Sequence, residues 1–260
     1  MALFMRPGDP GCIFILERMI PLTEFWQQLR DNLTFVLICG LIVAALALAA
    51  KLAERWLPAI RKTTKAKRIT LIAVCSAIAA VLHMLDFPLL FLAPEFYKLD
   101  FSELPVMLCG FYLGPSAAVF CEAVKILLKL LLKGTSTAFV GDFANFAVGC
   151  SLVLPASMIY HAHKTKTGAI VGLIVGTLVL TVFGSAFNAI YLLPKFSQLF
   201  GLPLDSIIAM GGKINGAIHS LSTFVLLAVA PLNLVKGITI SVLTLLLYKK
   251  TARPLFGIRE

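Results

Sequence analysis

Charged residues are scarce in this chain. Only 14% of the 260 residues are charged, whereas 59% are hydrophobic, and the mean hydropathy is +0.94. Soluble domains carry about a quarter charged residues, so this composition excludes an ordinary soluble domain and indicates an integral membrane protein. No Gly-xxxx-Gly-Lys-Ser/Thr motif is present, which excludes ATP binding by a P-loop.

Catalytic and metal-binding motifs are missing as well. The sequence contains neither His-Glu-xx-His nor Gly-x-Ser-x-Gly, and its four histidines are scattered. The six cysteines form no CxxC pair and no Cys/His ligand spacing, so they are interpreted as small hydrophobic residues. An intramembrane enzyme would need paired acids or a metal cluster, but Asp86, Glu122 and Asp142 stand alone in the sequence.

Acidic residues are outnumbered by basic ones, 13 to 23, which gives a net charge of +10. The basic residues cluster between apolar runs, where they orient a membrane protein, so no nucleic-acid partner is expected. The positive-inside rule places residues 51–68, residues 161–167 and the tail 251–260 in the cytoplasm. We therefore expect a multi-pass protein of the cell membrane whose C-terminus is cytoplasmic.

The apolar runs predict an all-α integral membrane protein with one extra helix before a six-helix bundle. Residues 1–32 are expected to be extracellular or interfacial, residues 33–50 to form the extra N-terminal transmembrane helix, and residues 51–68 to form a basic cytoplasmic linker. The membrane domain 69–250 is expected to contain spans at 69–92, 102–113, 116–132, 140–160, 168–193 and 231–248. Outward-facing, partly inserted helical pieces are expected over 195–229, because a full span there would place the C-terminal lysines outside.

Polar side chains gather at the outer ends of the predicted spans. They are Asp100 in the first outer loop, Asp142 and Asn145 at the start of 140–160, Asn188 and Tyr191 at the end of 168–193, and Asn233 and Lys236 at the start of 231–248. Their depths coincide, which predicts a pocket for a flat, amphipathic, hydrogen-bonding small molecule. A single amide could equally well bond a neighbouring helix, but amides from three helices favour a site.

Lys236 is the most informative of these residues. It lies three positions after Asn233, so both side chains share one helix face. A lysine inside a bilayer costs several kcal/mol unless it meets a partner, a cavity or the interface, which makes Lys236 a functional candidate. The alternative is that it snorkels to the outer interface. Glu122, Lys125 and Lys129 also share a face, and there an internal ion pair is favoured over a place in the site.

Ala73 and Ala77 place two small side chains on one face of the first span. Such faces let helix backbones approach closely, either inside the bundle or against another subunit. Internal packing is the commoner explanation, because small residues are frequent in membrane helices.

Five segments together carry a family resemblance. They are Leu99–Pro105, Gly110–Pro115, Gly141–Phe146, Asn188–Pro194 and Ala230–Gly237. In order and topology they resemble the substrate-binding S components of energy-coupling factor (ECF) transporters, specifically the riboflavin-specific RibU branch. The resemblance runs from about Lys67 to Lys250 and implies a six-helix subunit that is not an enzyme.

The resemblance also implies a ligand and its contacts. Riboflavin would be captured at the extracellular side as a transported ligand rather than a cofactor, and acceptance of FMN stays open. Asn188, Asn233 and Lys236 would bind the isoalloxazine ring, and the first outer loop, with Leu99 and Asp100, would act as a lid. A different vitamin or flavin-like compound is the alternative.

Partners follow from the same resemblance. Such subunits deliver their vitamin through a shared module that consists of an ECF transmembrane coupling protein and two ATP-binding subunits. In that family the face matching Ala73 and Ala77 docks on the coupling protein. The implied partners are thus riboflavin, the coupling module and the lipid bilayer.

Overall fold

The computed structural model describes residues 27, 30, 33–57, 64–135 and 137–252 of the chain. The expectations for residues 1–32 and 251–260 therefore fall almost entirely outside the described residues. The first half contains α3 (Leu33–Ala53), η2 (Glu54–Trp56), α4 (Lys65–Met84), β1 (Phe87–Pro88), β2 (Lys98–Leu99), α5 (Glu103–Leu113) and α6 (Pro115–Lys133). The second half contains α7 (Val140–Ala162), α8 (Lys166–Phe187), η3 (Asn188–Leu192), α9 (Leu193–Phe200), α10 (Leu204–Gly212), α11 (Leu221–Phe224), η4 (Val225–Val229) and α12 (Ala230–Ala252).

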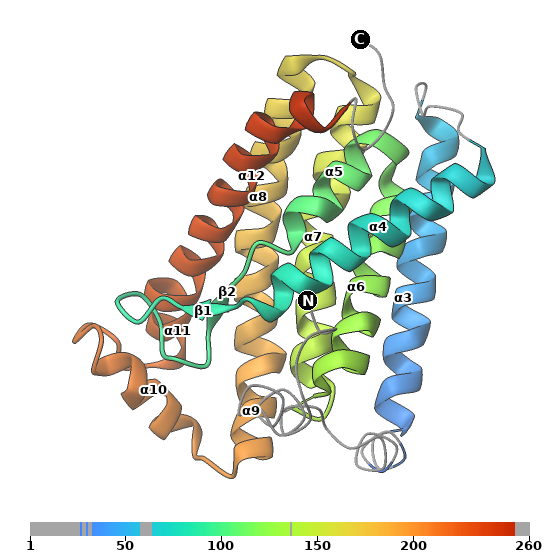
Figure 1. Cartoon of the computed structure of the whole chain (residues 1–260). Coiled ribbons are helices and arrows are strands. Elements are labelled where there is room, and N and C mark those ends of the chain that lie inside the picture. Colours follow the sequence, from blue (N-terminus) through green and yellow to red (C-terminus); the bar gives the residue numbers. More distant parts are fainter. Residues whose placement is uncertain (1–26, 28–29, 31–32, 58–63, 136, 253–260) are drawn as a thin grey trace, which may run out of the picture.

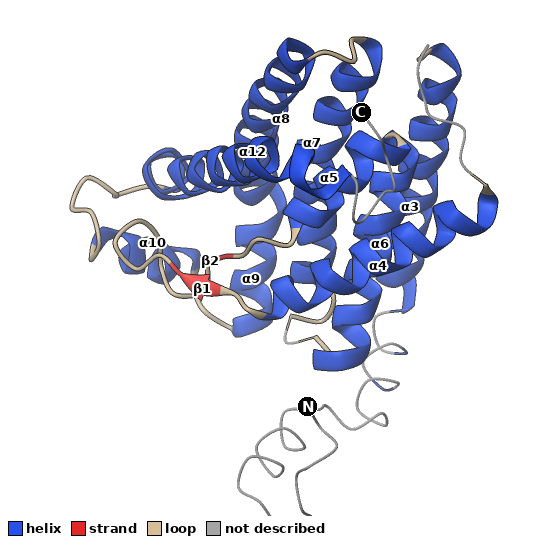
Figure 2. Cartoon of the chain, turned by 45° about the horizontal axis from the view of Figure 1, so that its top comes forward, coloured by secondary structure: helices blue, strands red, loops and turns tan. Residues whose placement is uncertain are grey.

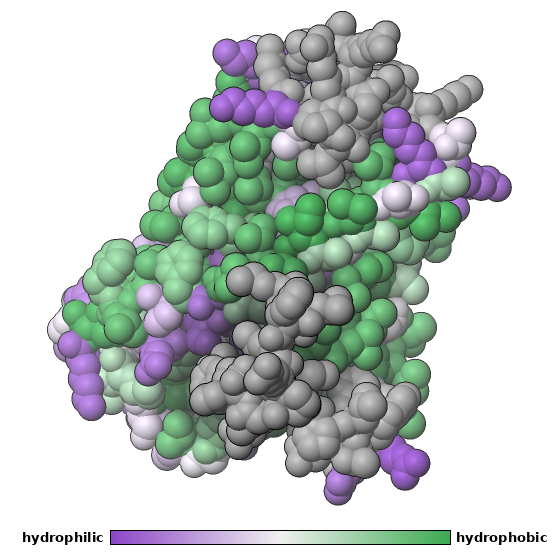
Figure 3. Space-filling model, in the orientation of Figure 1, coloured by the Kyte–Doolittle hydropathy of each residue, from purple (hydrophilic) through white to green (hydrophobic). Residues whose placement is uncertain are grey.

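The long helices form one bundle. α7 packs against both α6 and α8, α8 packs against α12, and α4 crosses obliquely over α5 and α6 (Figure 1). Hydrophobic residues cover much of the face shown in Figure 3, and hydrophilic side chains gather mainly toward its ends. This surface is the one expected of helices that face lipid.

Five helical stretches among the described residues are long and apolar enough to cross a membrane. They are Leu33–Trp56, Lys65–Met84, Val140–Ala162, Lys166–Phe200 and Leu221–Tyr248. α5 has only 11 residues, about 17 Å of helix, and α6 carries four charged side chains. The all-α membrane fold is therefore as predicted, whereas the count of six spans beside the extra helix stays a prediction.

The extra N-terminal helix, α3, is attached to the bundle along one edge. Ala47 and Ala50 pack against α6 and α7 in a cluster that includes Val119 and Cys150. Beyond α3, a carboxylate oxygen of Glu54 accepts a hydrogen bond from the backbone N–H of Ser116 at 2.8 Å and lies 3.7 Å from the Arg68 guanidinium. The basic segment 51–68 thus contains contacts that hold α3 to the start of α4 and α6.

The first span ends earlier than predicted. α4 stops at Met84 rather than at residue 92, because Pro88 cannot donate a helical hydrogen bond and biases the preceding residue toward extended backbone. Phe87 and Pro88 instead pair antiparallel with Leu99 and Lys98. Figure 2 shows these two short strands, β1 and β2, near α9 and α10.

The last span begins earlier than the predicted residue 231. Leu221–Tyr248 is one continuous helical stretch, which passes through the π-helical turn η4. A capping box starts it: the Ser220 hydroxyl accepts from the Thr223 N–H at 3.2 Å, and the Ser220 N–H donates to the Thr223 hydroxyl at 2.9 Å. Of the helical pieces expected over 195–229, only α10 is separate, because α9 continues the stretch Lys166–Phe200 and residues 221–229 belong to the last span.

The turn between α5 and α6 depends on one glycine. Gly114 has φ 106° and ψ 167°, a region that is essentially restricted to glycine, and Pro115 opens the next helix. Every residue of α5 is buried, so a shift of this turn would disturb the centre of the bundle.

We expect Gly114→Ala to lower the free energy of unfolding by about 1–3 kcal/mol, because a side chain strains this backbone conformation. Thermal unfolding of the detergent-purified protein measures the effect. Gly40→Ala is the matched control, since nothing lies within 4 Å of a Cβ built at Gly40 in α3. Equal melting temperatures for the two variants would contradict the strain argument.

Candidate functional site

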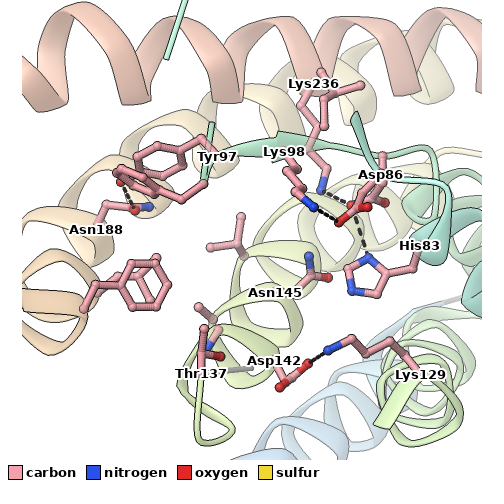
Figure 4. A pocket seen from close by; sticks show the side chains of 18 of the residues that line it. His83, Asp86, Tyr97, Lys98, Lys129, Thr137, Asp142, Asn145, Asn188 and Lys236 are labelled. Atoms are coloured by element: carbon pink, nitrogen blue, oxygen red, sulfur yellow. Dashed lines mark hydrogen bonds and ion pairs between the residues drawn. The ribbon is translucent and has the colours of Figure 1, made fainter. Parts of the chain in front are cut away.

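One cavity of about 390 Å³ opens among the loop around β2, α6, α7, η3 and α12. Its size lies in the range of small-molecule pockets, roughly 300–1,000 Å³. Its lining residues are His83, Asp86, Phe96, Tyr97, Lys98, Leu99, Asp100, Lys129, Lys133, Gly134, Thr135, Thr137, Gly141, Asp142, Ala144, Asn145, Val148, Asn188, Leu192, Phe196, Leu232, Asn233 and Lys236. Figure 4 shows polar side chains from several elements pointing into it.

Seven of the eight candidate binding residues lie on this cavity. They are Leu99, Asp100, Asp142, Asn145, Asn188, Asn233 and Lys236. Tyr191, the eighth, is not among the lining residues, and its ring packs against Phe187 with the centroids 5.2 Å apart. The π-helical turn η3 explains this difference, because a π-helix has more residues per turn than an α-helix. Leu192, four residues after Asn188, therefore faces the cavity with it, whereas Tyr191 is rotated away from the cavity.

The Asn188 amide is held from both sides. Its oxygen accepts a hydrogen bond from the Tyr97 hydroxyl at 2.7 Å, and its nitrogen donates to the Gly184 carbonyl at 2.7 Å. Burial raises the pKa of Tyr97, so the phenol stays neutral and acts as the donor. This contact joins the loop that contains β1 and β2 to the end of α8.

The Asn233 amide has an unused donor. Its Nδ2 atom is buried and has no hydrogen-bond partner among the described residues. The side chain packs against Gly184, where an added Cβ would lie 2.7 Å from Nδ2, so the glycine leaves space for it. A buried polar atom without a partner costs about 1–3 kcal/mol, which makes Asn233 a candidate for bonding a ligand.

Lys236 is bound inside the protein rather than extended to the interface. Its Nζ atom lies 2.9 Å from Glu103 Oε1 and 3.5 Å from Asp100 Oδ2, and only 11% of the side chain is exposed. The snorkelling alternative is therefore wrong for the described structure. Glu103, on the first turn of α5, is the carboxylate nearest to this lysine.

Asp100 has three partners around its carboxylate. Its Oδ1 atom accepts from the Ser102 N–H at 2.8 Å, and its Oδ2 atom lies 3.2 Å from His83 Nδ1 and near Lys236. Burial by itself would raise the pKa of Asp100, but Lys236 and His83 outweigh it and hold the pKa well below its usual range. Asp100 therefore stays ionised and keeps the loop that contains β2 attached to α4 and α12.

Lys125 extends the buried network from α5 into α6 and α7. It forms the predicted ion pair with Glu122, lies 3.5 Å from Glu103 Oε1, and donates to Asn145 Oδ1 at 3.1 Å. Because Asn145 lines the cavity, this ion pair is directly behind the cavity wall. Glu103 thus lies between two lysines, Lys125 and Lys236.

A second set of charges lies along the cavity. Lys129 Nζ is 2.5 Å from Asp142 Oδ1, and Asp86 lies 3.4 Å from Lys98 and 3.7 Å from Lys133. His83, Lys129 and Lys133 were not predicted as site residues, because each acquires its role only through a partner on another element.

Residues 67–248 match the family model described as ECF transporter, substrate-specific component. The chain belongs to this family. It is 36% identical over 186 residues to the riboflavin transporter RibU of Staphylococcus aureus (strain TCH60), covering 72% of this chain and 90% of that relative. The riboflavin transporter FmnP of Bacillus subtilis (strain 168) is 31% identical over 187 residues, covering 72% and 92%.

A solved structure supports the same assignment. A structure described as the S component of a bacterial ECF transporter aligns with a TM-score of 0.58 and 35% identity, covering 74% of this chain and 99% of that chain. The protein is therefore a multi-pass membrane subunit of a transporter, and the names of its family and relatives are those of transporter components rather than enzymes. α3 lies outside the residues matched by the family model.

We expect Glu103→Gln to destabilise the protein by about 3–5 kcal/mol, because it leaves Lys236 and Lys125 with less counter-charge in a buried setting. Asp86→Asn is the control, because its partner Lys98 is 44% exposed and such pairs are worth about 0–1 kcal/mol. Thermal unfolding of both purified variants measures the difference. A Glu103→Gln protein as stable as Asp86→Asn would show that the buried network does not hold the bundle together.

Proposed function

We propose that this S component captures riboflavin in the cavity from the extracellular side and delivers it with an ATP-driven ECF module. The observation that carries the proposal is the unused Asn233 donor, which lies on one cavity with the amides of Asn188 and Asn145. The names of the two relatives, both riboflavin transporters, support the choice of ligand.

The chemistry of riboflavin matches this cavity. The isoalloxazine ring is flat, with an apolar edge and an opposite edge that carries carbonyl acceptors and an N–H group. Phe96, Tyr97 and Phe196 offer aromatic surface on the cavity wall, and the amides of Asn188 and Asn233 offer donors and acceptors. A pocket that is mostly apolar with a few fixed polar groups is the usual form of such a site.

A different vitamin or flavin-like compound remains the alternative ligand. The purified protein distinguishes them directly: a yellow protein with a flavin absorption spectrum supports riboflavin. A colourless protein that cannot be loaded with riboflavin would favour the alternative.

The first outer loop is proposed to act as the lid of the cavity. Tyr97, Leu99 and Asp100 line the cavity, and the loop is attached to α12 through Asp100 and Lys236. β2 and the start of α12, which contribute residues to the cavity, lie well below the last turns of α12 in Figure 1. With the basic segments inside by the positive-inside rule, the cavity faces outward and the C-terminus is cytoplasmic.

Energy for uptake is proposed to come from partner subunits, since the sequence has no P-loop. Ala73 and Ala77 are exposed on α4, together with Val74 and Ile78, which are 41% and 42% exposed. Internal packing therefore does not explain this small-residue pair in the described chain. We propose this face as the docking surface for the ECF transmembrane coupling protein, which brings the two ATP-binding subunits.

We expect Lys236→Met to weaken riboflavin binding roughly tenfold to a hundredfold, because a hydrogen bond from a charged group is worth about 1.5–3 kcal/mol. Quenching of riboflavin fluorescence on titration with the purified protein measures this affinity. Lys213→Met, at an exposed position outside the cavity, is the control and should bind normally. If a folded Lys236→Met protein bound riboflavin with unchanged affinity, Lys236 would have no role in ligand binding and would serve only in its ion pair with Glu103.

We expect Ala73→Trp to bind riboflavin normally but to fail to co-purify with the coupling complex and to support no uptake. A bulky side chain on this exposed face holds a partner helix away without reaching the cavity. Riboflavin titration, co-purification and cellular uptake are measured on the same variant. Ile190→Trp is the control, because Ile190 is 80% exposed on η3, away from α4. Normal uptake by Ala73→Trp would contradict the docking role and would indicate that this face of α4 contacts lipid.

A further inference from the structure

Three segments meet at the end of the bundle where α3 stops. Glu54 directly follows α3, Arg68 lies near the start of α4, and Ser116 lies in the first turn of α6. A carboxylate oxygen of Glu54 accepts a hydrogen bond from the Ser116 N–H at 2.8 Å and lies 3.7 Å from the Arg68 guanidinium. The guanidinium in turn donates to the Ser116 hydroxyl at 2.7 Å. We call these contacts the Glu54 junction, and Figure 1 shows the end of α3 beside the start of α4.

The junction caps a helix that has no side-chain cap of its own. α6 begins at Pro115 after Gly114, which has no side chain to accept a hydrogen bond. The first N–H groups of a helix lack partners within the helix, and the positive end of its macrodipole favours a negative charge. The Glu54 carboxylate provides both the acceptor and the charge. Because only 13% of the Glu54 side chain is exposed, solvent screens this contact less than one on the surface.

The start of α4 depends on the same junction. Of residues 65–70, only Arg68 is partly buried, and the other five are exposed. Arg68 is thus the side chain that attaches these first turns of α4 to α6. A second attachment is Ser76, which is fully buried and donates to the Cys121 carbonyl of α6 at 3.1 Å. α4 is therefore held to α6 at two points, about 12 Å apart along the helix.

The proposed docking face lies beside these two points. Ala73 lies between Arg68 and Ser76 in the sequence, and Ala77 follows Ser76 directly. Helices that pack through small residues need their backbones to approach closely, so a small shift or rotation of α4 would change which side chains a partner helix meets. The two attachments keep Ala73 and Ala77 on the outside of the bundle.

Glu54 comes from a part of the chain outside the family match, whereas Arg68 and Ser116 lie within it. We infer that Glu54 is a positioning residue for partner docking, which holds Arg68 and Ser116 so that α4 presents the face around Ala73 to the coupling protein in one orientation. This inference rests on the proposed function. It gives the extra N-terminal helix a role, because α3 carries Glu54 to the junction.

The test uses the full-length protein, purified alone for riboflavin titration and co-expressed with the coupling complex for co-purification and uptake. Glu54→Ala removes both contacts of the carboxylate, so co-purification and uptake should fall several-fold. Riboflavin affinity should stay unchanged, because Glu54 does not line the cavity. Glu54→Gln keeps an oxygen that can accept from the Ser116 N–H but loses the charge that faces Arg68, so its effect should be intermediate.

A double-mutant cycle tests whether Glu54 acts through Arg68. Arg68→Ala should lower co-purification by a similar factor. The double variant Glu54→Ala with Arg68→Ala should lower it little further, because the two side chains belong to one contact. If the two separate losses multiplied in the double variant, Glu54 and Arg68 would act independently and the inference would be overturned.

Arg55→Ala is the matched control, because Arg55 is the exposed neighbour of Glu54 and its removal should leave co-purification unchanged. All variants are compared well below the lowest of their melting temperatures, so that a less stable variant is still folded. Normal co-purification by Glu54→Ala would overturn the inference, and so would a loss of riboflavin affinity, which would show that the junction holds the whole bundle.

A variant that does not fold still leaves a decision. If Glu54→Ala did not fold, normal co-purification by Arg68→Ala would overturn the inference in its place. If the unmodified chain bound no riboflavin or did not co-purify with the coupling complex, the proposed function itself would be wrong.

Discussion

The contact between Lys236 and the carboxylates of Glu103 and Asp100 is the constraint on which the site depends. A lysine buried in the membrane is costly unless it meets a partner, and here the partners come from α5 and from the loop that contains β2. The same contact therefore joins α12 to the centre of the bundle and to the proposed lid. Lys125 on α6 also lies beside Glu103 and donates a hydrogen bond to Asn145 on α7. α6 and α7 are therefore connected to the same set of charges.

Much of this arrangement could be predicted from the sequence. The apolar runs predict the long helices, and the spacing of Asn233 and Lys236 predicts that both side chains face one pocket, which the structure places on a common cavity. Asn188 is found there too, although the π-helical turn that directs it inward and turns Tyr191 away has no recognisable sequence pattern.

The missed features depend on contacts between distant segments or on weak local signals. His83 and Lys129 look like ordinary helix residues until Asp100 and Asp142 are placed beside them. The end of α4 and the start of the last span were predictable in principle. Pro88 argues against a helix through residue 92, and Ser220 with Thr223 forms a capping box, but the hydrophobicity of the neighbouring residues dominated both predictions.

The attachment of α3 gives the subunit two unlike sides. Through Ala47 and Ala50 the extra helix packs on α6 and α7, whereas Ala73 on α4 is exposed in the part of the chain that the structure describes. A protein approaching within the plane of the membrane therefore meets the extra helix on one side and exposed small side chains of α4 on the other. Because α3 covers part of α6 and α7, a partner helix can reach the bundle from fewer directions, whatever specific contacts it then makes.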